Sequence, residues 1–131
     1  MRTVAKSGYA KVYARGHPGA GNGAMSEHTL IAEKALGKFL PPKAHVHHVD
    51  GGKAENRGGN LVICQDCAYH RLLHVRQAAF DACGNANWRK CAFGDHYDDP
   101  ANMVVHARGK KTPAYCHRQC RRAYDARRKV A

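Results

Sequence analysis

The sequence predicts a small α+β protein in which two short strands and a helix surround a group of histidines. Two β-branched segments, residues 44–49 and 61–63, flank a polar loop that is rich in glycine. Helical patterns of apolar residues occur at residues 27–36 and 66–82. The chain also holds ten His and six Cys. We expect a hairpin and a helix before the histidine-rich unit, and a Cys/His-rich module after it.

The composition predicts a thin core and a polyanionic partner. Leu, Ile, Val and Phe number 20 of the 131 residues, so bound metal is the expected additional source of stability. The formal net charge of +12 points to nucleic acid, with a membrane surface as the alternative. Apolar runs are too short to cross a membrane and no signal-peptide pattern is present. We therefore expect a cytoplasmic protein of a bacterium or phage-infected cell, in which cysteines are metal ligands or free thiols.

Turn and cap residues predict the first elements of the fold. Alternation from Tyr9 to Tyr13, followed by two glycine-rich turns, predicts a hairpin within residues 1–25. His17 is expected at the surface of a turn. Ser26 is a suitable N-cap for a helix at residues 27–36, and Gly37 is a suitable residue to end it. The histidine and the second glutamate of that helix, His28 and Glu33, are expected to be structural or to face solvent.

Residues 45–74 hold five of the ten histidines. His47 and His48 lie on the first strand, and the following loop ends at Asn60. Residues i and i+4 of a helix share one face, so His70 and His74 can reach a single ion. The expected buried positions of their helix are Tyr69, Leu72, Leu73, Val75, Ala79 and Phe80.

Three neutral imidazoles that leave a coordination position open are typical of a catalytic metal site. His47, His70 and His74 are the expected ligands, which leaves His48 as a base near pH 7. Adjacent strand residues point to opposite faces, so a twist or bulge before Asp50 is needed if both side chains are to address one pocket. The alternative is that these histidines are ordinary polar residues of a strand and a helix.

The segment HHVDGGKAENRGGNL, followed by AYHRLLH, closely resembles the HNH endonucleases, in particular the small phage and homing-type members. The preceding segment SEHTLIAEKALGKFLPP is also similar to theirs. The resemblance implies a ββα-metal core, in which a two-stranded hairpin and a helix hold one metal ion. It implies that His48 is the general base that activates water and that Asn60 fixes the loop. It also implies metal binding by His47, where many relatives have Asp, by His70, and by His74, which matches an additional histidine of the colicin-type nucleases.

All-imidazole ligation favours Zn, Ni, Co or Mn over Mg, which prefers oxygen ligands. Activity with Mg stays open if His74 does not bind. We expect residues 1–82 to form the nuclease core with its hairpin and helix. Residues 83–131 are expected to form the Cys/His-rich, zinc-like module with a basic helical tail.

The segment WRKCAFGDHYDDPANM resembles the zinc module that follows the nuclease motif in phage HNH proteins. A second cysteine is expected at position 94, where this chain has Gly94. His96, Cys116 or Cys83 would replace it, or zinc would not bind. The candidate ligands of this structural zinc are Cys91, His96, Cys116, His117 and Cys120.

Cys64 and Cys67 have the spacing of a zinc knuckle, but two ordinary thiols are an equally good interpretation. Basic residues are expected to contact the DNA backbone, with a solvated charged face as the alternative. These candidate contacts are Lys53, Arg57, Arg71, Lys110, Lys111, Arg121 and Arg122.

Three functions are consistent with these residues. The first is a metal-dependent endonuclease that hydrolyses or nicks DNA with one divalent ion, Zn, Ni, Mn or Mg, at its active site. The second is a zinc-stabilised DNA-binding module whose nuclease site is degenerate. The third is a nuclease or toxin directed at RNA.

Overall fold

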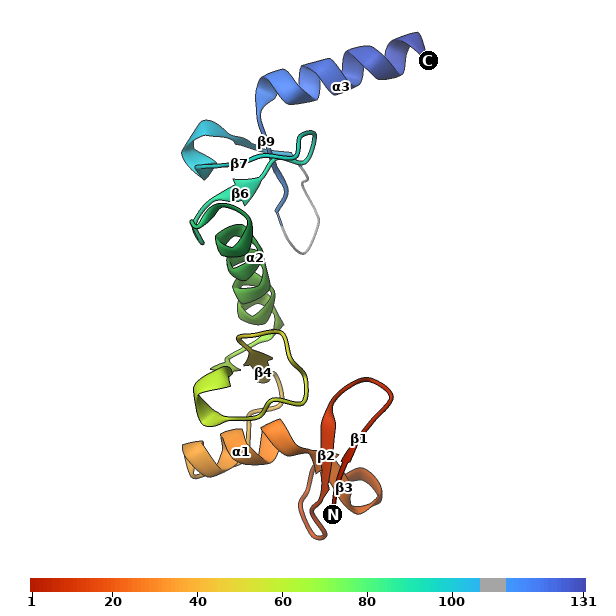
Figure 1. The fold of residues 1–131 in the computed structure, drawn as a ribbon, viewed down its shortest axis with the longest axis vertical. Helices are drawn as coiled ribbons and strands as arrows, with labels where there is room; N and C mark the ends of the chain where they lie inside the picture. Colours follow the sequence, from red (N-terminus) through yellow and green to blue (C-terminus); the bar gives the residue numbers. More distant parts are fainter. Residues whose placement is uncertain (107–112) are drawn as a thin grey trace. The chain divides into compact units, whose positions relative to one another are not determined.

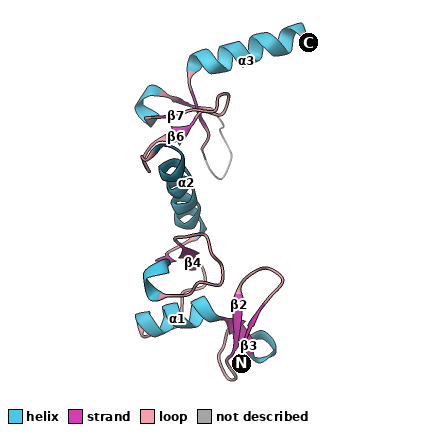
Figure 2. Ribbon diagram, in the orientation of Figure 1, coloured by secondary structure: helices cyan, strands magenta, loops and turns pink. Residues whose placement is uncertain are grey.

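The computed structural model describes residues 1–106 and 113–131, which form two compact units, Met1–His70 and Arg71–Ala131 (Figure 1). Short antiparallel hairpins and helices occur in the described chain, which confirms the α+β class (Figure 2). The boundary between the units falls in the sequence of a helix, Cys67–Cys83. The domain boundary after residue 82 stays a prediction, because a helix that continues from one unit into the next does not mark where a domain ends.

The first unit begins with a three-stranded antiparallel sheet. Its strands are β1 (Arg2–Val4), β2 (Ala10–Tyr13) and β3 (Ala24–Ser26), in the order β1-β2-β3. The predicted hairpin is present as β2 and β3, and β1 adds a third strand. Gly16 and Gly23 have positive φ angles in the turn between β2 and β3, a conformation that glycine adopts without steric cost.

Helix α1 (Glu27–Leu36) has the predicted bounds. Ser26 has the extended backbone of an N-cap, but its hydroxyl accepts a hydrogen bond from Lys11 Nζ at 3.0 Å and does not cap a helix N–H. Gly37 ends the helix in the left-handed conformation, with φ of 68°. The helix packs against β2, β3 and the hairpin that follows it, so residues near its start lie beside that hairpin.

Strands β4 (His45–His48) and β5 (Leu61–Cys64) form the predicted hairpin, and α2 (Cys67–Cys83) follows it. Their register runs without interruption from His45 opposite Cys64 to His48 opposite Leu61. The bulge that would let both histidines address one pocket is therefore absent from β4. Because successive residues of a regular strand point to opposite faces, His47 and His48 have different neighbours.

The expected burial of α2 is wrong for its largest side chains. Tyr69 and Leu72 are each 40% exposed and Phe80 is 56% exposed, whereas Ala79 is fully buried. The chain has few large apolar residues that could cover them. The buried apolar residues of the described chain are small or medium-sized: Ala10, Met25, Ala32, Cys64, Ala79, Cys91 and Cys116.

The second unit contains two more hairpins and the C-terminal helix. Strands β6 (Arg89–Lys90) and β7 (Tyr97–Asp98) pair, as do β8 (Val104–Val105) and β9 (Tyr115–Cys116). A parallel bridge between Cys91 and Tyr115 joins the two hairpins. Helix α3 (Arg118–Val130) follows and includes the predicted basic helical tail.

None of the helices described for this chain combines the length and the apolar composition that crossing a membrane requires.

Candidate metal centres

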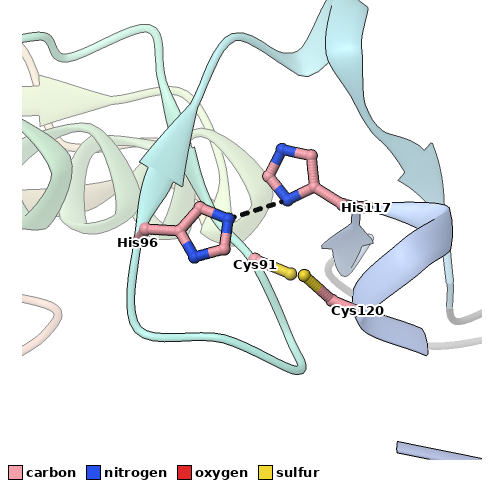
Figure 3. A group of neighbouring side chains, drawn as sticks. All are labelled: Cys91, His96, His117 and Cys120. Atoms are coloured by element: carbon pink, nitrogen blue, oxygen red, sulfur yellow. Dashed lines mark hydrogen bonds between the residues drawn. The ribbon is translucent and has the colours of Figure 1, made fainter. Parts of the chain in front are cut away.

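Four side chains of the second unit form a Cys/His group (Figure 3). Cys91 and His96 come from the turn that joins β6 and β7, while His117 and Cys120 come from the first turn of α3. One potential ligand atom of each residue lies within 4.8 Å of the others. Ligand atoms of a tetrahedral zinc ion are about 3.3 to 3.8 Å apart, so a small closure brings all four onto one ion.

One thiol of the Cys/His group, that of Cys91, is shifted toward the form that binds metal. Burial acts to raise the pKa of Cys91, but hydrogen bonds from the backbone at His117 and Phe93 and from the His117 ring outweigh it, so the pKa is lowered. A thiolate is the form of cysteine that binds zinc. Burial and the neighbouring Cys91 raise the pKa of Cys120. One proton is therefore held between the two thiols, and a bound ion would take the place of this proton.

A carboxylate orients one imidazole of the Cys/His group. Asp98 Oδ2 accepts a hydrogen bond from His117 Nε2 at 2.9 Å, which leaves His117 Nδ1 facing His96 Nε2 at 3.0 Å. The other oxygen of Asp98 accepts bonds from Asn102 Nδ2 and the Asp99 amide. The donor set therefore fits zinc, because loss of the Nδ1 proton of His117 leaves a lone pair that faces the other ligands.

We expect Asp98→Asn to weaken zinc binding at the Cys/His group by about 10- to 100-fold, because the imidazole loses the carboxylate that orients it and makes it more basic. Competition with a chromophoric chelator measures this affinity. Asp125→Asn is the matched control, since it removes the same charge from an exposed position on α3. Equal zinc affinities for wild type and Asp98→Asn would contradict this role of Asp98.

His96 takes the place of the cysteine that we expected at position 94. A Cβ atom at Gly94 would lie 2.9 Å from His96 Nδ1 and Cε1, so the missing side chain makes room for the imidazole. Cys116 lies outside this group among the residues described, and its assignment as a ligand stays a prediction. Its side chain is fully buried in β9, and burial raises its pKa, so it packs as a small apolar thiol.

The remaining cysteines lie outside the groups of potential ligands found among residues 1–106 and 113–131. Cys64 is buried, whereas Cys67 and Cys83 are exposed. The interpretation of Cys64 and Cys67 as ordinary thiols stays a prediction.

A second group of potential metal ligands consists of His47, His70 and His74. His47 lies on β4, and the other two histidines are one turn apart on α2. Their ring nitrogens lie within 4.8 Å of one another, and the ring centroids of His47 and His70 are 5.3 Å apart. Three imidazoles favour Zn, Ni, Co or Mn over Mg, and the choice among these ions stays a prediction. His74 is exposed, so the group can leave a coordination position open to solvent.

His48 has a polar environment on the other face of β4. Its Nε2 atom lies 2.8 Å from Asn56 Oδ1, and its ring centroid lies 5.2 Å from that of His28 and 6.0 Å from that of Tyr9. The residue is only 6% exposed. It is therefore available as a hydrogen-bonded base, but it has little solvent contact.

Asn60 closes the loop between β4 and β5. Its Oδ1 accepts from the Asp50 amide at 3.0 Å, and its Nδ2 donates to Asp50 Oδ1 at 2.8 Å and to the Glu55 carbonyl at 2.7 Å. The Val49 amide also donates to the Asn60 carbonyl. These bonds connect both halves of the loop to the end of β4, directly after His48.

No protein-family model, curated protein or solved structure matches this chain. The roles proposed below rest on the geometry of these residues and on the sequence motif.

His28 is a half-buried histidine beside His48. Burial lowers its pKa to about 4, and the positive charges of His48 and Lys11 contribute in the same direction. In the unfolded chain His28 binds a proton near pH 6.5, so between pH 6.5 and 4 the unfolded state binds more protons than the folded state. Stability is therefore lost as the pH falls through this window.

We expect the free energy of unfolding to decrease between pH 7 and pH 5, and the decrease to be smaller in His28→Phe than in wild type. The part due to His28 is at most about 2 kcal/mol. Urea denaturation of both proteins at both pH values measures it. Comparing the two proteins removes the contributions of other titrating groups, which they share. An equal decrease in the free energy of unfolding for wild type and His28→Phe would show that folding does not lower the pKa of His28.

The predicted DNA contacts are mostly exposed. Lys53 and Arg57 lie on the loop after β4, and Arg121 and Arg122 lie on α3, while Arg71 on α2 is half-buried. The remaining two candidates, Lys110 and Lys111, lie outside the described residues.

Sequence reasoning missed the partners of the predicted residues. Glu27, Asn56 and Asp98 each orient a histidine or its partner, but short acidic and amide side chains are too common for spacing alone to single them out. The prediction for His17 is wrong, because it is largely buried and pairs with Glu33 at 2.7 Å.

Proposed function

We propose that this chain is a metal-dependent endonuclease of the HNH type that hydrolyses or nicks DNA. One observation carries the proposal. His47, His70 and His74 offer three imidazole nitrogens within 4.8 Å of one another, and the residue next to His47 is a hydrogen-bonded histidine. A metal group and a base on neighbouring positions of one strand are the two components that hydrolysis of a phosphodiester requires.

His48 is the proposed general base. It would accept a proton from the water that attacks phosphorus, while Asn56 holds its ring and Asn60 holds the strand end that carries it. His47, His70 and His74 would hold the ion. When bound, the ion supplies Lewis-acid stabilisation of charge on the phosphate oxygens.

Positive charge on the exposed surface would bind the DNA backbone. Helix α3 carries six cationic side chains and one acidic residue, Asp125. Its cations are Arg118, Arg121, Arg122, Arg127, Arg128 and Lys129. Such a surface favours binding that weakens steeply with salt and depends little on sequence.

A second function is favoured by the burial of His48. With only 6% of the residue exposed, and with its side chain on the face of β4 opposite His47, the base needs a change on DNA binding before it can meet a phosphate. The Cys/His group needs no such change. A zinc-stabilised DNA-binding module with a degenerate nuclease site is therefore the alternative.

Cleavage of supercoiled plasmid distinguishes these two functions. The full chain is incubated with plasmid in the presence of Mg, Mn, Ni or Zn, and with chelator as control. Nicked or linear product that requires a divalent ion supports the endonuclease. Salt-sensitive plasmid retention without new strand ends under any metal supports the binding module. Cleavage of structured RNA but not of plasmid would show that the substrate is RNA.

A further inference from the structure

The hydrogen bonds around His48 continue to the first strand of the protein. Arg2 Nε donates to both carboxylate oxygens of Glu27, at 3.1 and 2.9 Å, and Arg2 Nη2 donates to the Ala54 carbonyl at 2.8 Å. Asn56 Nδ2 donates to Glu27 Oε2 at 2.6 Å. Asn56 Oδ1 in turn lies 2.8 Å from His48 Nε2. One chain of hydrogen bonds thus connects β1, the start of α1 and the loop after β4 to His48.

The direction of these hydrogen bonds follows from the carboxylate. The hydrogen bond from Asn56 is the largest influence on the pKa of Glu27, and together with Arg2 it lowers that pKa against the effect of burial. Glu27 is therefore ionised at neutral pH and can only accept hydrogen bonds. The NH₂ group of Asn56 has to face Glu27, which turns the amide oxygen toward His48.

The orientation of Asn56 determines which nitrogen of His48 carries the proton. An amide oxygen can only accept, so His48 Nε2 has to donate. A neutral imidazole has one N–H group, and its other nitrogen is then the basic one. His48 and Asn56 are 6% and 9% exposed, so water does not readily replace this hydrogen bond if the ring turns over.

We propose that Glu27, acting through Asn56, is a positioning residue that holds neutral His48 in a single tautomer, with Nε2 protonated and Nδ1 as the proton acceptor. The catalytic meaning of this arrangement rests on the proposed nuclease function. The tautomer itself can be measured without any activity.

Glu27→Gln is the variant that tests the proposal. A glutamine side chain can present either an oxygen or an NH₂ group, so Asn56 is no longer forced to direct its oxygen at His48. We expect a mixture of the two His48 tautomers. We also expect kcat to fall at least tenfold, up to the 10²- to 10⁴-fold that a general base typically contributes, with little change in DNA affinity.

Glu55→Gln is the matched control. It makes the same change of charge in the loop that carries Asn56, and its exposed carboxylate bonds to Arg57. We expect the wild-type tautomer and the wild-type rate in this variant.

Two-bond ¹H–¹⁵N correlation spectra of the full-length, zinc-loaded protein report the tautomer at a pH where His48 is neutral. The His48 signals are those that disappear in His48→Gln. A protonated Nε2 in wild type, lost or mixed in Glu27→Gln and kept in Glu55→Gln, supports the proposal.

A protonated Nδ1 in wild type overturns it without requiring a variant to fold. An unchanged tautomer in Glu27→Gln also overturns it. Absence of cleavage by wild type would overturn the nuclease function, while the spectra would still decide the role of Glu27.

Discussion

His48→Ala is expected to reduce DNA cleavage by about 10²- to 10⁴-fold, the usual contribution of a general base, while DNA affinity stays close to that of wild type. The variant keeps all three histidines of the metal group, and the basic residues of α3 are unchanged. Only proton transfer from water is removed. Plasmid cleavage under single-turnover conditions measures the rate, and filter binding measures the affinity.

His70→Ala separates the role of His48 from that of the metal group. Loss of one ligand of the His47, His70 and His74 group should reduce both metal affinity and rate, whereas His48→Ala should reduce the rate alone. Calorimetric titration of both variants with the activating metal tests this difference. Circular dichroism of the same samples establishes the folded fraction. Wild-type rates for His48→Ala, with contaminating nuclease excluded, would refute its role as a base.

Removal of zinc from the Cys/His group is expected to unfold the unit Arg71–Ala131. Structural zinc contributes about 10–16 kcal/mol in small zinc-dependent peptides, which is as large as the whole stability of a typical domain. The buried apolar residues of this unit are only Ala79, Cys91 and Cys116 among the residues described, and Cys91 is itself a ligand. Beyond these buried side chains, the ring contacts of Phe93 with His106 and with Tyr124 of α3 join the described parts of the unit.

Cys120→Ser and Cys83→Ser form a matched pair for this prediction. Cys120 belongs to the Cys/His group, whereas Cys83 is exposed and lies outside it. We expect Cys120→Ser to lose one equivalent of zinc and to unfold this unit, and Cys83→Ser to behave as wild type. The single tryptophan, Trp88, lies in this unit and reports its unfolding by fluorescence. An unchanged Trp88 signal after chelation, with zinc shown to be absent, would contradict the prediction.

The sequence predicted the helices and the central hairpin well because their signals are local. Ser26 and Gly37 mark the ends of α1, and the β-branched segment Leu61–Cys64 follows a loop rich in glycine. Burial was predicted poorly for α2. An apolar stripe on a helix indicates which face prefers to be covered, but Tyr69 and Phe80 show that coverage also requires enough apolar surface elsewhere in the chain.

The sequence by itself supplied the candidate metal ligands, because imidazole and thiol groups at helical or turn spacing lie close enough together to share one ion. His70 and His74 are joined by one turn of helix, and His117 and Cys120 by the start of another. Only the tertiary structure decided that His96 and not Cys116 completes the Cys/His group, because that choice depends on how two hairpins and α3 come together. It also decided that Glu27 and Asn56 orient His48, since hydrogen bonds between residues 29 and 8 positions apart depend on the packing of α1 against the hairpin and not on any local pattern.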